Sequence, residues 1–168
     1  VVAGNTDSQS RMRTLARNKQ FYYFALYQGK QRVTEDGVFT GEYETSYSDC
    51  QLAKDNISAS KGAATDDVFG INLNYSKSIV TAEDRKIDEY SVLWLTYEEL
   101  AEIGNSSHTQ GDLGLYQGRI YKCTSSYEGA YDGGYWELVP HTHKVVGVAK
   151  SLNSITYAIR EVDIDEED

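Results

Sequence analysis

Two histidines close together in the sequence are the residues best suited to bind a metal ion. His141 and His143 are separated by one residue, so on a β-strand both side chains would point to the same face. Zinc sites use histidines in this way but need further ligands, and His108 is the only other histidine. The two cysteines are not at ligand spacing. We therefore expect histidines at a strand edge, with no metal and no cofactor.

A group of acidic residues raises a second possibility, which is acid–base catalysis. Glycoside hydrolysis needs two carboxyl groups flanking the scissile bond. The candidates are Glu98, Glu99, Glu102 and Asp112. A short helix over residues 97–103, with Thr96 as its N-cap and Gly104 at its end, would place the three glutamates outward without any catalytic role. The motifs of serine hydrolases, P-loop proteins and dinucleotide-binding proteins are missing from the sequence, and we expect no enzymatic activity.

Residues 111–139 are rich in tyrosine and glycine and indicate binding. Stacked aromatic rings with a polar rim suit both sugars and protein surfaces. The block resembles the short aromatic modules of chitin-binding domains and of many phage tail proteins. The candidate partner or glycan surface consists of Tyr116, Tyr121, Tyr127, Tyr131 and Trp136. The simpler interpretation is that these rings cover a β-sheet.

Composition limits the class of protein. A chain of 168 residues favours one domain, and its formal charge of −10 argues against nucleic acid as an attractive partner. Cys50 and Cys123 are too few for a disulfide framework, so we expect reduced thiols. No apolar run reaches the ~18 residues of a membrane helix, and the N-terminus has no signal-peptide layout. We expect a soluble protein that is not secreted.

The elements that would position these residues are mainly strands. The C-terminal segment 144–162 predicts a β-hairpin that turns at residues 152–154, and the unbroken apolar run 92–95 predicts a central strand covered on both faces. Further strands are expected at 21–27, 31–35, 39–47 and 71–80, with turns at 28–30 and 36–37. In the aromatic block, a hairpin turning at 117–118 and a strand at 135–139 would form a small three-stranded sheet. The predicted fold is mainly β: a small barrel or sandwich with a long loop, a β-rich insertion and one short helix.

A long exposed loop is expected in the middle of residues 56–70, where small and polar residues show little periodicity. Such a loop in a compact domain is more often functional than idle. Residues 1–11 are interpreted as a flexible leader, and Met12 as the natural start. Residues 12–168 would form a single β-barrel domain, with 96–143 as an inserted, hairpin-rich subdomain.

Four stretches together resemble a known family. Residues 12–20, 69–81, 87–94 and 148–159, in this order, are similar to head-closure proteins of long-tailed bacteriophages, also called head-completion or stopper proteins. The resemblance covers most of residues 12–95 and 144–164. It does not cover 96–143, where we expect a much shorter connection in the family.

The resemblance implies a structural protein of the virion neck. Such a protein would be made in the host cytoplasm and assembled as a ring of twelve or six copies between the portal-adaptor protein and the tail. Double-stranded DNA would pass through the ring without sequence-specific binding. The loop would gate or face the channel through Asn56, Ser58, Ala59, Ser60, Lys61, Gly62, Ala63 and Ala64. The alternatives are a tail-terminator or tail-tube ring protein and a carbohydrate-binding accessory virion protein.

Overall fold

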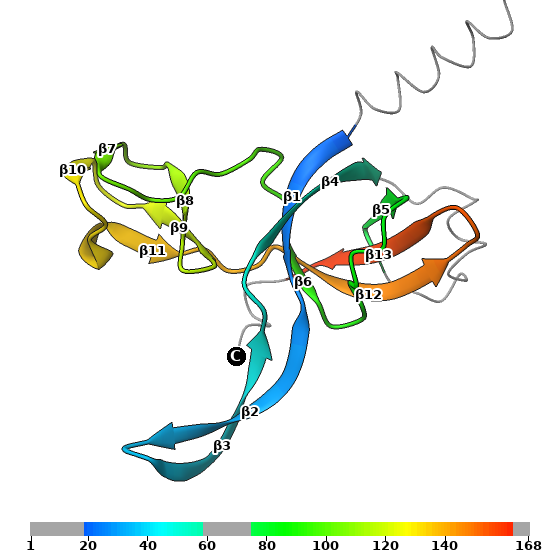
Figure 1. Cartoon of the computed structure of the whole chain (residues 1–168), viewed down its shortest axis with the longest axis horizontal. Coiled ribbons are helices and arrows are strands. Elements are labelled where there is room, and N and C mark those ends of the chain that lie inside the picture. The colour runs from blue at the N-terminus through cyan, green and yellow to red at the C-terminus, as the bar shows by residue number, and fades with distance from the viewer. Residues whose placement is uncertain (1–18, 59–74, 163–168) are drawn as a thin grey trace, which may run out of the picture.

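The described part of the chain, residues 19–58 and 75–162 of this computed structural model, consists mostly of β-strands. Six antiparallel strands close into a barrel in the order β1-β4-β5-β13-β12-β6 (Figure 1). Their bounds are β1 Lys19–Ala25, β4 Gln51–Ser58, β5 Lys77–Thr81, β6 Val92–Trp94, β12 His143–Lys150 and β13 Ile155–Glu161. The predicted mainly-β barrel fold is confirmed.

Strand β1 is apolar on both faces because both faces are covered. Tyr22 and Phe24 belong to the cluster that fills the barrel. Tyr23 and Ala25 alternate with them and pack in a second cluster, together with residues that follow β6. The side chains of strand β6 alternate in the same way: Leu93 lies in the first cluster, and Val92 and Trp94 lie in the second. A continuous apolar run is the expected sequence of such a doubly covered strand.

The predicted C-terminal hairpin is confirmed. Strands β12 and β13 pair from His143 opposite Glu161 to Lys150 opposite Ile155, with one register shift between them. The turn between the two strands lies within residues 151–154. Strand β6, predicted as the central partner of this hairpin, pairs with β12 on one side and with β1 on the other.

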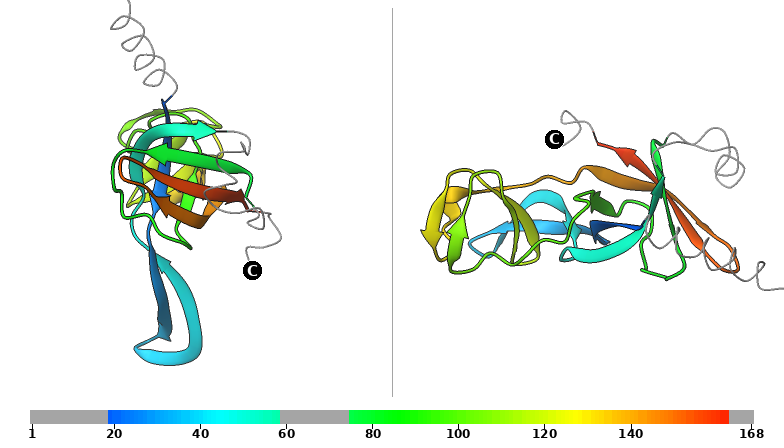
Figure 2. Two further views of the ribbon diagram at one scale, coloured as in Figure 1. Left: turned by 90° about the vertical axis from the view of Figure 1, so that its right-hand side faces the viewer. Right: turned by 90° about the horizontal axis from the view of Figure 1, so that it is seen from above.

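A two-stranded arm projects from the barrel and is formed by β2 (Tyr27–Glu35) and β3 (Val38–Tyr47) (Figures 1 and 2). Its turn is Asp36-Gly37, as predicted, and both residues have positive φ, 51° and 81°. The predicted turn at residues 28–30 is wrong. There the chain continues through β2, and Gly29, with a φ of 85°, lies at a register shift. A glycine that tolerates positive φ can belong to a β-bulge as well as to a turn.

The segment between β6 and β12 forms two further small sheets. One has three strands in the order β11-β9-β8, and the other pairs β10 with β7. The bounds are β7 Ser106–His108, β8 Leu113–Tyr116, β9 Arg119–Cys123, β10 Tyr127–Gly129, the 3-10 helix η1 Gly133–Tyr135, and β11 Trp136–Leu138. The predicted hairpin with its turn at Gln117-Gly118 and the predicted third strand are confirmed.

These sheets are fixed to the barrel and to the root of the arm, where β2 begins at Tyr27 and β3 ends at Tyr47. Leu100 and Ile120 are buried in the second cluster with Tyr23. The Trp94 indole donates a hydrogen bond of 2.9 Å to the Val139 carbonyl. Apolar burial and satisfied polar groups thus join the segment after β6 to the outer face of the barrel.

The predicted helix over residues 97–103 is wrong. Tyr97 has a φ of +58°, and the chain from Ala101 to Ile103 runs beside β8. The Leu115 amide donates a hydrogen bond to the Ala101 carbonyl, and the Leu115 carbonyl accepts one from the Ile103 amide. The Tyr23 hydroxyl accepts a hydrogen bond from the Leu100 amide at 2.8 Å and donates to its carbonyl at 3.3 Å. These tertiary contacts replace the hydrogen bonds of a helical turn and override a weak local propensity.

Strand β4 was missed by the sequence patterns. It extends to Ser58, so Asn56 and Ser58, predicted as loop, pair with β5 as strand residues. The rest of the predicted loop, at 59–70, lies outside the described residues, as do residues 1–18 and with them the predicted leader and Met12. The strand predicted at 71–80 is described only from residue 75, and β5 begins at Lys77.

Candidate interaction surfaces

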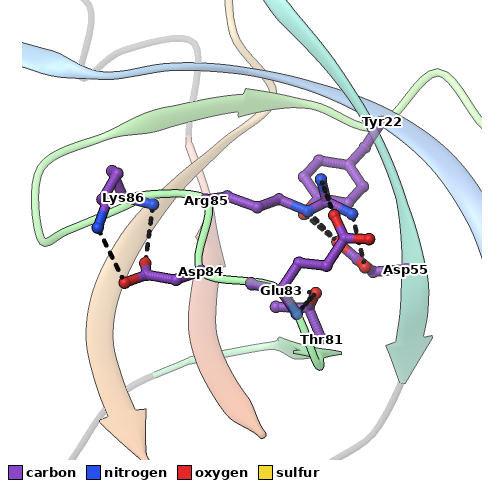
Figure 3. Close-up of polar contacts among 7 residues, drawn as sticks. All are labelled: Tyr22, Asp55, Thr81, Glu83, Asp84, Arg85 and Lys86. Carbon is purple, nitrogen blue, oxygen red and sulfur yellow. Dashed lines mark hydrogen bonds and ion pairs between the residues drawn. The ribbon is translucent and has the colours of Figure 1, made fainter.

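A buried carboxylate holds a loop against the barrel (Figure 3). Asp55 of β4 is almost fully buried and accepts two hydrogen bonds from Arg85, Nε to Oδ2 at 2.8 Å and Nη2 to Oδ1 at 3.0 Å. The Tyr22 hydroxyl donates to the same Oδ2 at 2.6 Å. Burial first, and then the hydrogen bond to Asp55, raise the pKa of Tyr22. The hydrogen bond from Arg85 to Asp55 raises the pKa of Arg85, so this side chain stays charged.

The loop of residues 82–91 that carries Arg85 is held by further polar contacts. The Lys86 amide donates to Asp84 Oδ1 at 3.0 Å, and the Lys86 Nζ lies 3.3 Å from Asp84 Oδ2 (Figure 3). The Glu83 amide donates to the Thr81 hydroxyl at 3.0 Å. Lys86 keeps a φ of +63°, an uncommon conformation that these contacts support. These contacts therefore fix the conformation of the loop.

A groove of about 770 Å³ lies between this loop, β12 and the root of the arm. Its apolar lining comes from Tyr27, Ile87, Tyr90 and Val148. Tyr90 is 62% exposed and has a φ of +75°, while its amide donates to the Val145 carbonyl at 3.2 Å. An aromatic residue held exposed in a strained conformation indicates a function for that position. No local sequence pattern indicates this groove, because its lining comes from three segments that are distant in the sequence.

The predicted aromatic surface forms two separate groups. In the first, Tyr116 and Tyr131 stack with ring centroids 3.7 Å apart, and Tyr121 lies edge-on to both at 6.2 and 6.1 Å. All three rings are half-buried. Because Tyr116 and Tyr131 stack on each other, each ring has one face covered by the other.

The second group contains Tyr127 and Trp136. Tyr127 stacks on Tyr135 at 4.6 Å, and the Trp136 indole donates a 2.6 Å hydrogen bond to the Tyr127 hydroxyl. Trp136 is only 7% exposed and packs edge-on against His108. A sugar platform requires an open ring face. Trp136 therefore serves packing, whereas binding by the tyrosines stays a prediction.

The three histidines do not meet. His108 lies on β7, far along the chain from His143 at the start of β12, and its Nε2 is 2.9 Å from the Gly104 carbonyl. His141 contacts the rings of Tyr47 and Trp94. His143 is buried, and burial, with a smaller contribution from Lys77, lowers its pKa to about 4. In the described ranges no group of three or more His, Cys, Asp or Glu residues is placed to hold a metal ion.

The four acidic residues line one cleft of about 430 Å³ between the 98–103 segment and β8. They share this cleft with apolar side chains, including Leu100 and Ile103. Glu98, Glu99, Glu102 and Asp112 are all exposed. Solvent screens exposed carboxylates, so this arrangement by itself specifies no reaction.

The predicted gating loop is described only at its first residues. Asn56 and Ser58 lie at the end of β4, and the candidates from Ala59 to Ala64 lie outside the described residues. The cysteines are free thiols, Cys50 half-buried and Cys123 buried. Burial raises the pKa of Cys50 to about 11.

Within the described ranges no helix has the length and apolar character needed to cross a membrane. No protein-family model, curated protein or solved structure matches the chain.

Proposed function

We propose that this chain is a structural protein of the neck of a long-tailed phage. In this role it forms a ring between the portal-adaptor protein and the tail, closes the head after DNA packaging, and provides the surface to which the tail attaches. The proposal combines the sequence resemblance with the shape of the molecule, a small barrel that carries projecting elements.

The observation that carries the proposal is the projecting arm. Its strands contact each other and leave Val38 and Tyr43 exposed at 68% and 57%. An isolated two-stranded hairpin is only marginally stable in water, and exposed apolar groups on such an element mark a protein-interaction site. A barrel with an arm of this kind suits a protein that functions by assembly.

The charge of the chain supports the same role. A formal charge of −10 repels the phosphate backbone, so DNA could slide through a ring of these chains without adhering to it. A basic channel would instead bind the DNA and slow its exit. The ring is proposed to contain twelve or six copies.

In vitro complementation tests the proposal. Purified protein is added during DNA packaging to a packaging-competent lysate of a phage that lacks this gene and its tail genes, purified tails follow, and plaque-forming particles are counted. We expect the titre to rise when the protein is added before the tails. No rise at any concentration, with correctly folded protein, would contradict the neck role.

The order of addition separates the neck role from the alternative of a tail terminator. A terminator would act when it is incubated with tails, and a head-closure protein when it is incubated with heads. A carbohydrate-binding accessory protein would leave assembly in the lysate intact.

A further inference from the structure

We propose that the tip of the arm of one copy docks in the groove beside the arm root of a second copy. The groove is the one lined by Tyr27, Ile87, Tyr90 and Val148. The proposal rests on the self-association required by the proposed function and names the two surfaces that make the contact.

The arm presents a compact aromatic and basic face. Arg32 lies opposite Tyr43 in the β2–β3 pairing, and its guanidinium is 5.0 Å from the centroid of the Phe39 ring. Phe39 and Tyr43 are in edge contact at 5.4 Å. Val38, next to the turn, is the most exposed apolar side chain of the arm, and as the neighbour of Phe39 on β3 it points to the opposite side of the tip. Arg32, Phe39 and Tyr43 form a preassembled anchor, because aromatic and arginine side chains dominate interface energies.

The groove offers a matching receptor. Tyr90 provides an exposed ring, 5.6 Å from Tyr27, above a buried Ile87. The loop that forms one wall is fixed by Arg85 through its buried pair with Asp55 (Figure 3). A rigid receptor loses little conformational entropy when it binds, which favours affinity.

Both surfaces carry charges of both signs, so a docked arm can bring opposite charges together. Arg32 lies on the arm face, while Asp88 and Glu89 line the groove. In the opposite sense, Glu35 lies at the tip of the arm, and the groove contains Lys150. Pairing opposite charges at the rim of an apolar contact gives specificity and orientation.

The groove of a chain cannot receive the tip of its own arm. Tyr27 is both the root of β2 and a wall of the groove, and the strand from Tyr27 to Glu35 carries the tip roughly 25 Å away at its usual rise per residue. The contact therefore requires another molecule. Because the arm tip and the groove are different surfaces, the contact is heterologous, and repetition of it generates a ring or a filament.

The face of the arm, rather than its edges, makes the contact. Register shifts interrupt the β2–β3 pairing between Tyr27 and Lys30 and between Arg32 and Thr34. Bulges of this kind are a common protection of exposed strand edges against pairing with another chain.

Cross-linking between two variants tests the contact in the full-length protein. Val38→Cys is placed in one chain and Glu89→Cys in a second, size-tagged chain, and the mixture is treated with a short bis-maleimide. Cys50 reacts slowly because burial raises its pKa to about 11, Cys123 is buried, and wild type treated with the same reagent measures the remaining background. The control pair is Val38→Cys with Leu152→Cys, since Leu152 is 97% exposed at the turn between β12 and β13.

We expect the yield of mixed dimer from Val38→Cys and Glu89→Cys to exceed that of the control pair about ten-fold, because docking raises the local concentration of the two thiols. Equal yields from the two pairs would overturn the proposal. Adding Arg32→Glu to the Val38→Cys chain should return the yield to the control level. Lys122→Glu, the same charge change on the exposed face of β9, should leave the yield unchanged.

The result is separable from the proposed function. Equal cross-linking yields with successful complementation of the lysate would reject this docking mode and retain the neck role. Specific cross-linking without complementation would retain the contact and reject the neck role.

Discussion

At the level of single residues, Asp55 is an acidic residue that needs partners because it is buried. It holds both Arg85 and Tyr22. Asp55→Asn keeps the shape but removes the charge, so the largely buried Arg85 loses its buried counter-ion and keeps only the exposed Glu83. We expect the free energy of unfolding in urea to fall by about 3 kcal/mol, the usual cost of leaving one member of a buried ion pair.

Glu83→Gln is the matched control for this change. Glu83 contacts the same Arg85 at 3.4 Å, but its side chain is exposed to solvent. The expected loss is below about 0.5 kcal/mol, since exposed ion pairs contribute little. Equal losses for the two variants would show that burial of Asp55 is not the source of its effect.

His143 should make stability depend on pH. Burial lowers its folded-state pKa to about 4, below the value of 6.5 for the free side chain. The unfolded chain therefore binds the proton more readily, and the contribution of His143 to stability is complete above about pH 6.5 and lost as the pH falls toward 4. Between pH 7 and pH 5 the wild type should lose about 2 kcal/mol more than His143→Gln. Urea unfolding at the two pH values measures this difference, and parallel losses in the two proteins would contradict it.

Some residue-level expectations followed from the sequence and others did not. The sequence groups Tyr116 and Tyr121 on one candidate partner or glycan surface; their rings do lie together, while binding by them stays a prediction. Trp136 was grouped with them by type, although it is buried. The Asp55–Arg85 pair joins residues of two separate elements, and no local pattern in the sequence indicates such a pair.

At the scale of elements, Gly114 determines how the 101–103 segment packs. A Cβ atom at Gly114 of β8 would lie 2.5 Å from Ile103 Cγ1 and 3.5 Å from the Ala101 carbonyl oxygen. We expect Gly114→Ala to lower the free energy of unfolding by about 2 kcal/mol, the typical cost of overpacking. Gly104→Ala is the control, since a Cβ atom there meets nothing within 4 Å and φ is not positive. Thermal or urea unfolding compares the two, and similar small effects would show that the segment moves freely.

Periodicity predicted the strands well where tertiary contacts agreed with it. The unbroken apolar run of β6 predicted a strand covered on both faces, and the run at β1 predicted a strand; the two clusters explain why both strands are apolar throughout. The helix predicted over residues 97–103 was wrong because the Tyr23 hydroxyl, and not a helical turn, provides hydrogen bonds to the Leu100 amide and carbonyl. Strand β4 was not predicted because one of its inward-facing residues is the polar Asp55, so the strand lacks an apolar alternation.

At the level of the whole molecule, three parts can be distinguished. The closed barrel forms the body, the segment between β6 and β12 forms a lobe beside it that packs on one outer face, and the arm extends outward (Figures 1 and 2). The Arg119 guanidinium donates hydrogen bonds to the carbonyls of Ser48 and Tyr47 at 2.8 and 3.2 Å, which ties the outer sheet to the arm root. The sequence predicted the hairpin of the arm but not its projection, because strand periodicity does not show where a hairpin points.

Electron microscopy of a lysate from a phage lacking this gene tests the proposed closure of the head. If the chain closes the head, complete tails will lie separate from heads that have lost their DNA, and supplying the gene in trans will restore virions. Full virions that retain their DNA without the gene would contradict it.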